Sequence, residues 1–245
     1  MIDIGNTNLK WAWMRDGEVS GVQSSGHGGQ EPAIFAEACW GQAQSADRVV
    51  MANVAGRLLG KGIMEWISES WGIDVELVQT TATAFGVTNA YAIPEHLGVD
   101  RWLTLLAVHN ENPANVCIVD CGTAITIDVM GNNGHHLGGL ILPGFDLMRE
   151  ALLKQTHIPR VGRLESIDIL GTDTAGAVSS ASVHAAAALV DRVMESVSHR
   201  LGKRPVLVLT GSDATRLESV LTIPCEVSLD LVMRGLSLFA MEPKT

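Results

Sequence analysis

The stretch Ile2-Asp3-Ile4-Gly5-Asn6-Thr7 decides the fold, because a close copy of it, Val119-Asp120-Cys121-Gly122-Thr123, opens the second half of this 245-residue chain. In both copies an apolar strand ends in an aspartate, a glycine permits a tight reversal, and a hydroxyl residue follows. An extended pattern resumes after each turn, over residues 9–14 and 124–130. The sequence therefore predicts an internal duplication with two related halves.

The rest of the chain alternates short β-branched runs with longer segments of helical apolar spacing, which is typical of an α/β protein. Four runs are candidate strands: residues 49–54, 75–78, 116–119 and 206–210. The third strand and the helix of each half are predicted at residues 18–23 and 31–43, and at residues 135–142 and 145–154. Each half thus holds a strand-strand-strand-helix core. The turn at Asn110-Glu111-Asn112-Pro113 predicts two lobes, residues 1–113 and 114–245, which enclose an interlobe cleft with one Asp-Gly turn on each wall.

Composition excludes several classes of protein. Hydrophobic residues make up 47% of the chain, enough for a substantial core. No apolar run approaches the roughly 20 residues of a membrane span, and Met1 leads into a polar segment, so we expect a cytoplasmic protein without a membrane partner. The formal net charge of -10 argues against a nucleic-acid partner.

The four cysteines do not form a metal site. Cys39, Cys117, Cys121 and Cys225 are scattered, and the only close pair has no second pair to complete a ligand set. We interpret them as reduced core thiols.

The Asp-Gly turns are the candidate phosphate sites. An aspartate at a strand end suits hydrated Mg²⁺, while backbone N–H groups and hydroxyls of the turn can approach phosphate oxygens. A single such turn is more often a structural hairpin, but its duplication at half-chain spacing favours a nucleotide site. The chain has neither a P-loop nor a dinucleotide fingerprint, so phosphate binding must use the paired turns.

Three further segments each allow two interpretations. Gly211-Ser212-Asp213 after an apolar run is either an adenosine approach or an ordinary strand-to-helix turn. The Ala-rich stretch 173–201 is either a core helix or a subunit interface. Asp100 and Arg101, at a predicted helix start, are either a cap and a surface charge, or a general base and a carboxylate-binding group.

Four motifs together resemble type III pantothenate kinases, members of the acetate and sugar kinase, Hsp70 and actin superfamily. The first is Asp3, Gly5, Asn6, Thr7 and Lys10. The second is Asn89 and Tyr91, followed by Gly98, Asp100, Arg101 and Trp102. The third is Asp120, Gly122, Thr123, Ala124, Thr126 and Asp128, and the fourth runs from His136 to Gly144. The resemblance covers nearly the whole chain and implies two ribonuclease H-like lobes.

The resemblance also implies an activity, the transfer of the ATP γ-phosphoryl group to pantothenate at the start of coenzyme A synthesis. It assigns to the ATP site Asp3, Ile4, Gly5, Asn6, Thr7, Asn8, Leu9, Lys10 and Thr123. It assigns to the pantothenate site Tyr91, Gly98, Val99, Asp100 and Arg101, with Thr174 reached across the interface of a homodimer. Asp100 is the implied general base, Asp3 the Mg²⁺ residue, through water, and Asp120 the residue for a monovalent cation, K⁺ or NH₄⁺.

The sequence departs from the family pattern at three points. Asp173 replaces the usual Asn, Ser212 replaces the second Gly of a Gly-Gly pair, and only Met1 and Ile2 precede Asp3. The short first strand requires either support from neighbouring strands or a start codon further upstream. Two alternatives to the kinase stay open: a non-catalytic regulatory accessory protein of the same family, and a superfamily kinase or phosphatase for a sugar, acetate or exopolyphosphate.

Overall fold

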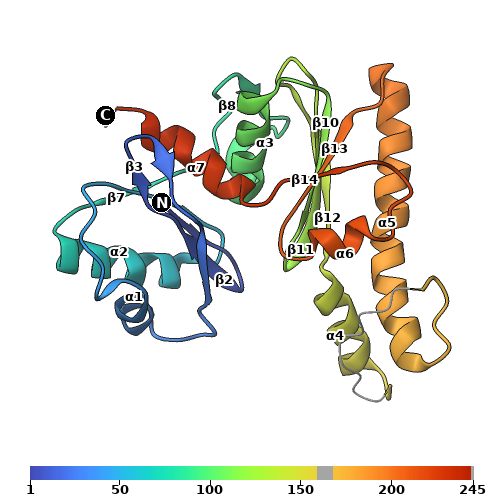
Figure 1. Ribbon diagram of the computed structural model, residues 1–245, viewed down its shortest axis with the longest axis horizontal. Helices are drawn as coiled ribbons and strands as arrows, with labels where there is room; N and C mark the ends of the chain where they lie inside the picture. Colours follow the sequence, from blue (N-terminus) through green and yellow to red (C-terminus); the bar gives the residue numbers. More distant parts are fainter. Residues whose placement is uncertain (159–167, 244–245) are drawn as a thin grey trace. The chain divides into compact units, whose positions relative to one another are not determined.

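The computed structural model describes residues 1–158 and 168–243, which form two compact units (Figure 1). Unit 1 comprises residues 1–111 and 230–245, and unit 2 comprises residues 112–229. The first division lies next to the predicted boundary at 113. The predicted lobe of residues 114–245 includes the C-terminal segment, whereas the described residues 230–243 pack with unit 1.

Unit 1 is built on a five-stranded mixed sheet in the order β5-β2-β1-β6-β7. The strands are β1 (Ile2–Ile4), β2 (Asn8–Trp11), β5 (Gln23–Gly26), β6 (Val49–Asn53) and β7 (Val75–Leu77). Neighbours on the β5 side of β1 run antiparallel, and neighbours on the β7 side run parallel. Because β1 pairs on both sides, and the Met1 ammonium donates to the Ala12 carbonyl at 2.9 Å, the neighbouring strands support the short strand that carries Asp3.

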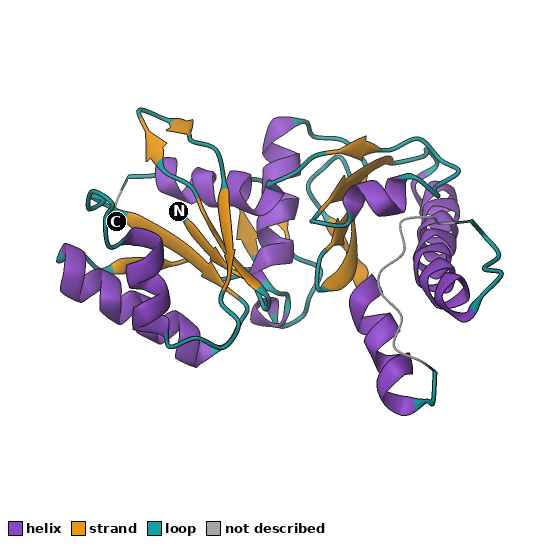
Figure 2. Ribbon diagram, turned by 60° about the horizontal axis from the view of Figure 1, so that its bottom comes forward, coloured by secondary structure: helices purple, strands orange, loops and turns teal. Residues whose placement is uncertain are grey.

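Helices cover both faces of the sheet of unit 1 (Figure 2). Helices α1 (Pro32–Trp40) and α2 (Arg57–Trp71) pack on one face, through a core that includes Ile4, Leu9 and Trp40. Helices α3 (Val99–Glu111) and α7 (Leu231–Met241) cover the other face. A Cβ at Gly235 of α7 would overlap the backbone of Leu103 in α3, so glycine permits this close helix packing.

The third strand of unit 1 begins later than the sequence predicts. Residues 18–23 were expected to form it, but β5 starts at Gln23, and β4 (Glu18–Val19) pairs only with β3 (Met14–Arg15). The cause is a tight local turn at Asp16 and Gly17, whose φ angles of 52° and 83° are those of a two-residue hairpin. A second ribbon, β8 (Thr83–Ala84) and β9 (Val87–Thr88), and a 3₁₀ turn (Pro94–His96) lead to α3.

Unit 2 repeats the sheet of unit 1 in the order β12-β11-β10-β13-β14. The strands are β10 (Val116–Cys121), β11 (Ala124–Met130), β12 (His136–Pro143), β13 (Val206–Thr210) and β14 (Glu226–Val227). Two antiparallel pairs and two parallel pairs occur in the same positions as in unit 1. The predicted duplication and the α/β fold of two ribonuclease H-like units are therefore confirmed.

One face of the sheet of unit 2 carries its core. Alternate residues of β10 and β11, among them Val119 and Ile127, pack with α4 (Phe145–Gln155), α5 (Thr174–Leu201) and α6 (Ala214–Glu218). Helix α5 buries one side in this core and exposes Ala177, Ala181 and Ala185 on another. The core interpretation of this helix is thus confirmed for its buried side.

No helix in the described part of the chain combines the length and the apolar character that crossing a bilayer requires. All four cysteines are free thiols. Cys117 and Cys121 are buried, and desolvation raises the pKa of each thiol to about 12. Cys39 and Cys225 are partly exposed, so only two of the four are fully buried core thiols.

Candidate active site

The first predicted phosphate turn connects β1 and β2 in unit 1. The Gly5 N–H donates to the Asn8 carbonyl at 3.0 Å, and a Cβ at Gly5 would lie only 3.0 Å from that oxygen. The next three side chains, Asn6, Thr7 and Asn8, are exposed. The turn thus exposes three polar side chains in a row.

The flanking strand residues divide between two faces of the sheet. Ile4 and Leu9 are fully buried in the core beneath α1 and α2, so only their backbone can serve a nucleotide. Asp3 pairs in register with Lys10, and facing residues of an antiparallel pair share one side of a sheet. Asp3, at 8% exposure, therefore lies on the same side as the Lys10 ammonium chain, close to the turn.

The second turn, in unit 2, is enclosed by glycines. The Gly122 N–H donates to the Ala124 carbonyl at 3.1 Å, and Thr123 is exposed. A Cβ at Gly144 would lie 2.5 Å from the Gly122 and Thr123 carbonyl oxygens. A Cβ at Gly211, whose φ is 90°, would overlap the Asp120 carboxylate. Gly211 opens the turn of residues 211–213, which the sequence left open as an adenosine approach or an ordinary strand-to-helix turn. Because Gly211 contacts Asp120, we include this turn in the candidate site.

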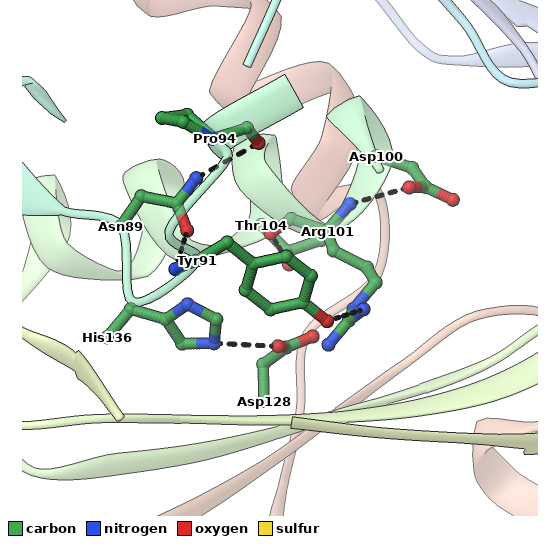
Figure 3. Close-up of polar contacts among 8 residues, drawn as sticks. All are labelled: Asn89, Tyr91, Pro94, Asp100, Arg101, Thr104, Asp128 and His136. Atoms are coloured by element: carbon green, nitrogen blue, oxygen red, sulfur yellow. Dashed lines mark hydrogen bonds and ion pairs between the residues drawn. The ribbon is translucent and has the colours of Figure 1, made fainter. Parts of the chain in front are cut away.

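In unit 1, a hydrogen-bonded loop before α3 places Tyr91 against Arg101 of that helix (Figure 3). The Asn89 side chain accepts from the Tyr91 N–H at 3.0 Å and donates to the Pro94 carbonyl at 3.3 Å. Arg101 is 5% exposed, and its Nη1 donates to the Tyr91 hydroxyl at 3.1 Å. Its guanidinium carbon also lies 5.8 Å from the centre of the Tyr91 ring, within cation–π range. A buried guanidinium held in this way is not a surface charge.

Asp100 occupies the first turn of α3. One of its carboxylate oxygens accepts from the Arg101 N–H at 2.8 Å, and the side chain is only partly buried. A Cβ at Gly98 would lie 2.5 Å from the same oxygen, so glycine leaves room for the carboxylate. The preceding Val99 is buried and contributes packing. Asp100 therefore accepts a hydrogen bond within the first turn of the helix and is itself partly exposed.

Two residues of the family motifs, Asp128 and His136, form a buried pair in unit 2. The sequence alone assigns no role to this pair. His136 Nε2 lies 2.9 Å from Asp128 Oδ1, and both side chains are at most 4% exposed (Figure 3). Asp128 is on the sheet face opposite the core, like Asp120 and Thr126. A charged residue two positions after Thr126 in an apolar strand is the signal that could have identified it.

Thr174 lies exposed at the first turn of α5. Asp173 is the N-cap of this helix and accepts from the Gly176 N–H at 2.7 Å, so the Asp in place of the usual Asn performs a capping role. Within residues 1–158 and 168–243, no three His, Cys, Asp or Glu side chains cluster in a way that could hold a metal ion. Asp3 and Asp120 are single carboxylates that would need other ligands to complete a coordination shell.

Comparison with known proteins identifies the family. The family model described as type III pantothenate kinase matches residues 1–196. The type III pantothenate kinase of Nitrosococcus oceani is 34% identical over 248 residues, covering 99% of this chain and 93% of the relative. That of Paracidovorax citrulli is 31% identical and covers 98% and 97%.

Solved structures agree at the level of the fold. The crystal structure of a conserved Baf family protein from Campylobacter jejuni superposes with a TM-score of 0.61 at 20% identity, covering 97% of this chain and 94% of that one. An activator of 2-hydroxyisocaproyl-CoA dehydratase from Clostridium difficile, with bound ADPNP, gives 0.52 at 15% identity, covering 98% and 92%. The long sequence matches, together with the four motifs placed above, show that this chain belongs to the type III pantothenate kinase family.

Proposed function

We propose that this chain transfers the γ-phosphoryl group of ATP to the primary hydroxyl of pantothenate, giving 4′-phosphopantothenate in the first step of coenzyme A biosynthesis. The observation that carries the proposal is the start of α3, where Asp100, which is partly exposed, stands between Gly98 and the buried Arg101. A general base and an anion-binding group are thus adjacent in a chain of this family. We expect the reaction to take place in the cytoplasm.

ATP is assigned to the two Asp-Gly turns. In unit 1, the backbone of residues 3–10 and the side chains of Asn6, Thr7 and Lys10 offer donors to phosphate oxygens. In unit 2, Thr123 offers a hydroxyl at the exposed tip of the other turn. Small residues at Gly211 and Ser212 suit a close approach of the nucleoside.

The carboxylates of the two turns fit cations. Mg²⁺ prefers oxygen ligands and commonly uses one or two carboxylates plus water and substrate phosphates, a role assigned to Asp3. Asp120 offers a carboxylate to K⁺ or NH₄⁺, and Gly211 lies so close to this carboxylate that a Cβ would overlap it. When bound, these cations neutralise phosphate charge.

Pantothenate is assigned to the loop that leads into α3. Its carboxylate suits the Arg101 guanidinium, which the Tyr91 hydroxyl and ring hold in place. Asp100 accepts the proton of the attacking hydroxyl as the new P–O bond forms. Because phosphoryl transfer has a loose transition state, most of the catalysis comes from positioning and charge neutralisation.

We further propose a homodimer in which Thr174 contacts the substrate bound to the other subunit. Two features support this arrangement: the exposure of Thr174 at the start of α5, and the small exposed residues Ala177, Ala181 and Ala185 further along the same helix. Small side chains allow two helices to approach closely.

A coupled ADP-release assay with pantothenate, ATP, Mg²⁺ and K⁺ tests the proposal, with mass spectrometry to identify 4′-phosphopantothenate. ADP release that depends on pantothenate is the expected result. Phosphorylation of sugars or acetate alone would instead identify another superfamily kinase. Absence of turnover with every acceptor would favour the regulatory alternative.

A further inference from the structure

His27 contacts the backbone of the first phosphate turn from outside it. Its Nε2 lies 3.0 Å from the Gly5 carbonyl oxygen. A carbonyl oxygen carries no proton, so Nε2 must be the donor, whether the imidazole is neutral or protonated. None of the four family motifs includes His27.

This hydrogen bond restrains one peptide plane of the turn. The Gly5–Asn6 peptide is trans, so the Gly5 C=O and the Asn6 N–H point in opposite directions within one rigid plane. Donation from His27 to the carbonyl therefore also fixes the direction of the Asn6 N–H. Gly5 makes such a restraint useful, because the backbone of a glycine rotates at little steric cost.

Backbone contacts and one ring contact hold His27 in place. His27 follows the last residue of β5, and Gly26 pairs in register with Asn8 at the far end of the turn. The His27 carbonyl accepts from the Gln30 N–H at 2.8 Å, which closes a turn through two glycines with φ of 50° and 75°. The His27 ring also meets the buried Phe35 ring edge to face, at a centroid distance of 6.4 Å. The donor is thus positioned before any ligand arrives.

We infer that His27 is a positioning residue for ATP, which orients the Asn6 N–H toward a phosphate oxygen by holding the Gly5 carbonyl. The inference rests on the proposed binding of ATP by this turn. It concerns nucleotide binding alone, because the hydrogen bond lies in the turn of residues 5–8 and not in the loop assigned to pantothenate.

Two variants test the hydrogen-bond donor of His27 separately from its ring packing. His27→Phe keeps a ring against Phe35 but removes the donor, and His27→Gln returns an N–H at similar reach. We expect His27→Phe to raise both the ATP dissociation constant, measured by calorimetry, and the KM for ATP about three- to tenfold, the loss of one hydrogen bond. His27→Gln should stay within about twofold of the wild type, and the KM for pantothenate at saturating ATP should not change in either variant.

His199→Gln, at an exposed histidine of α5, is the matched control and should leave all constants unchanged. Melting temperatures of all variants show whether any loss reflects folding. An unchanged ATP dissociation constant in His27→Phe would overturn the inference, and so would equal losses in the Phe and Gln variants or a loss that affects both substrates alike. If the wild type binds ATP but does not phosphorylate pantothenate, the proposed function fails while the calorimetry still decides the role of His27.

Discussion

Replacement of Asp100 by Asn should abolish most of the turnover and leave the fold and ATP binding intact. Positioned general bases contribute on the order of 10²- to 10⁴-fold to rate, so we expect kcat to fall by that range. Asn keeps the side-chain oxygen that accepts from the Arg101 N–H at 2.8 Å. The substitution removes the carboxylate charge at the helix start, a loss that by itself costs about 0.3–1 kcal/mol of stability.

Because the expected stability cost is small, a loss of turnover can be distinguished from a loss of the folded state. A loss of up to about 1 kcal/mol lowers the melting temperature by roughly 2–4 °C in a chain of this size. The assay is therefore coupled ADP release for kcat, calorimetry for the ATP dissociation constant, and thermal unfolding for the fold. Asp100→Ala is the matched comparison, because it removes the hydrogen-bond acceptor as well and should unfold at a lower temperature than Asp100→Asn.

Gly98→Ala perturbs the same carboxylate without changing its charge. A Cβ at this position would lie 2.5 Å from the Asp100 oxygen, so the carboxylate must move and kcat should fall here too. Turnover of Asp100→Asn within about threefold of the wild type, with saturating ATP and pantothenate, would refute the assignment of Asp100 as the general base. A large rise in the ATP dissociation constant would refute the claim that Asp100 acts on the acceptor alone.

Three further predictions concern other parts of the chain. Tyr91→Phe removes the hydroxyl that accepts from Arg101, so the KM for pantothenate should rise about three- to tenfold in steady-state assays while the KM for ATP stays constant. Gly211→Ala places a methyl group against the Asp120 carboxylate at a φ of 90°, so activation by K⁺ should weaken in a salt titration at constant ionic strength; unchanged activation would contradict the site. Cys117, whose thiol pKa is raised to about 12 by burial, should react with a thiol reagent at pH 8 only after unfolding, and rapid labelling of the native protein, located by peptide mass mapping, would contradict this.

Local pattern was sufficient to predict most of the strands. The run at 206–210 is β13 to the residue, and residues 124–130 are β11, because β-branched alternation between glycine-containing turns has few other solutions. The third strand of unit 1 was misplaced, since Asp16 and Gly17 form a hairpin of their own and delay β5 to Gln23. Turn chemistry overrode strand propensity at this point.

The position of the C-terminal helix could not be predicted from local pattern. Its place in unit 1 depends on contacts distant in sequence, such as Arg48, which donates to the Ala240 carbonyl at 2.9 Å and to Glu76 at 2.6 Å. The packing of Gly235 against Leu103 is a second contact between residues distant in sequence. Nothing in residues 231–241 alone distinguishes one amphipathic face from another.

The candidate site likewise has a part that local sequence predicts and a part that depends on contacts between distant elements. Its turns and the start of α3 were visible as motifs, because each depends on neighbours within a few residues. The contacts of Gly5 with His27, of Asp120 with Gly211, and of Asp128 with His136 join separate elements. A glycine or a histidine in a sequence does not say which group it will meet, so these three contacts emerge only from the structure.

The acidic character of the site has a consequence for its chemistry. ATP carries several negative charges. Under the proposed function, the turns that bind it contain the carboxylates Asp3 and Asp120. Lys10 is the one cation in the motif of the first turn. Two unit charges 4 Å apart interact by about 4 kcal/mol near a protein surface, so the carboxylates would repel the triphosphate unless cations intervene. Under the proposed function, we therefore expect ATP to bind together with cations. The neutral N–H groups of the turns attract phosphate without a counter-ion, and their effect depends on the direction in which the backbone holds them. This is why the orientation of a single peptide plane, such as that between Gly5 and Asn6, can matter more here than in a site lined with Lys and Arg.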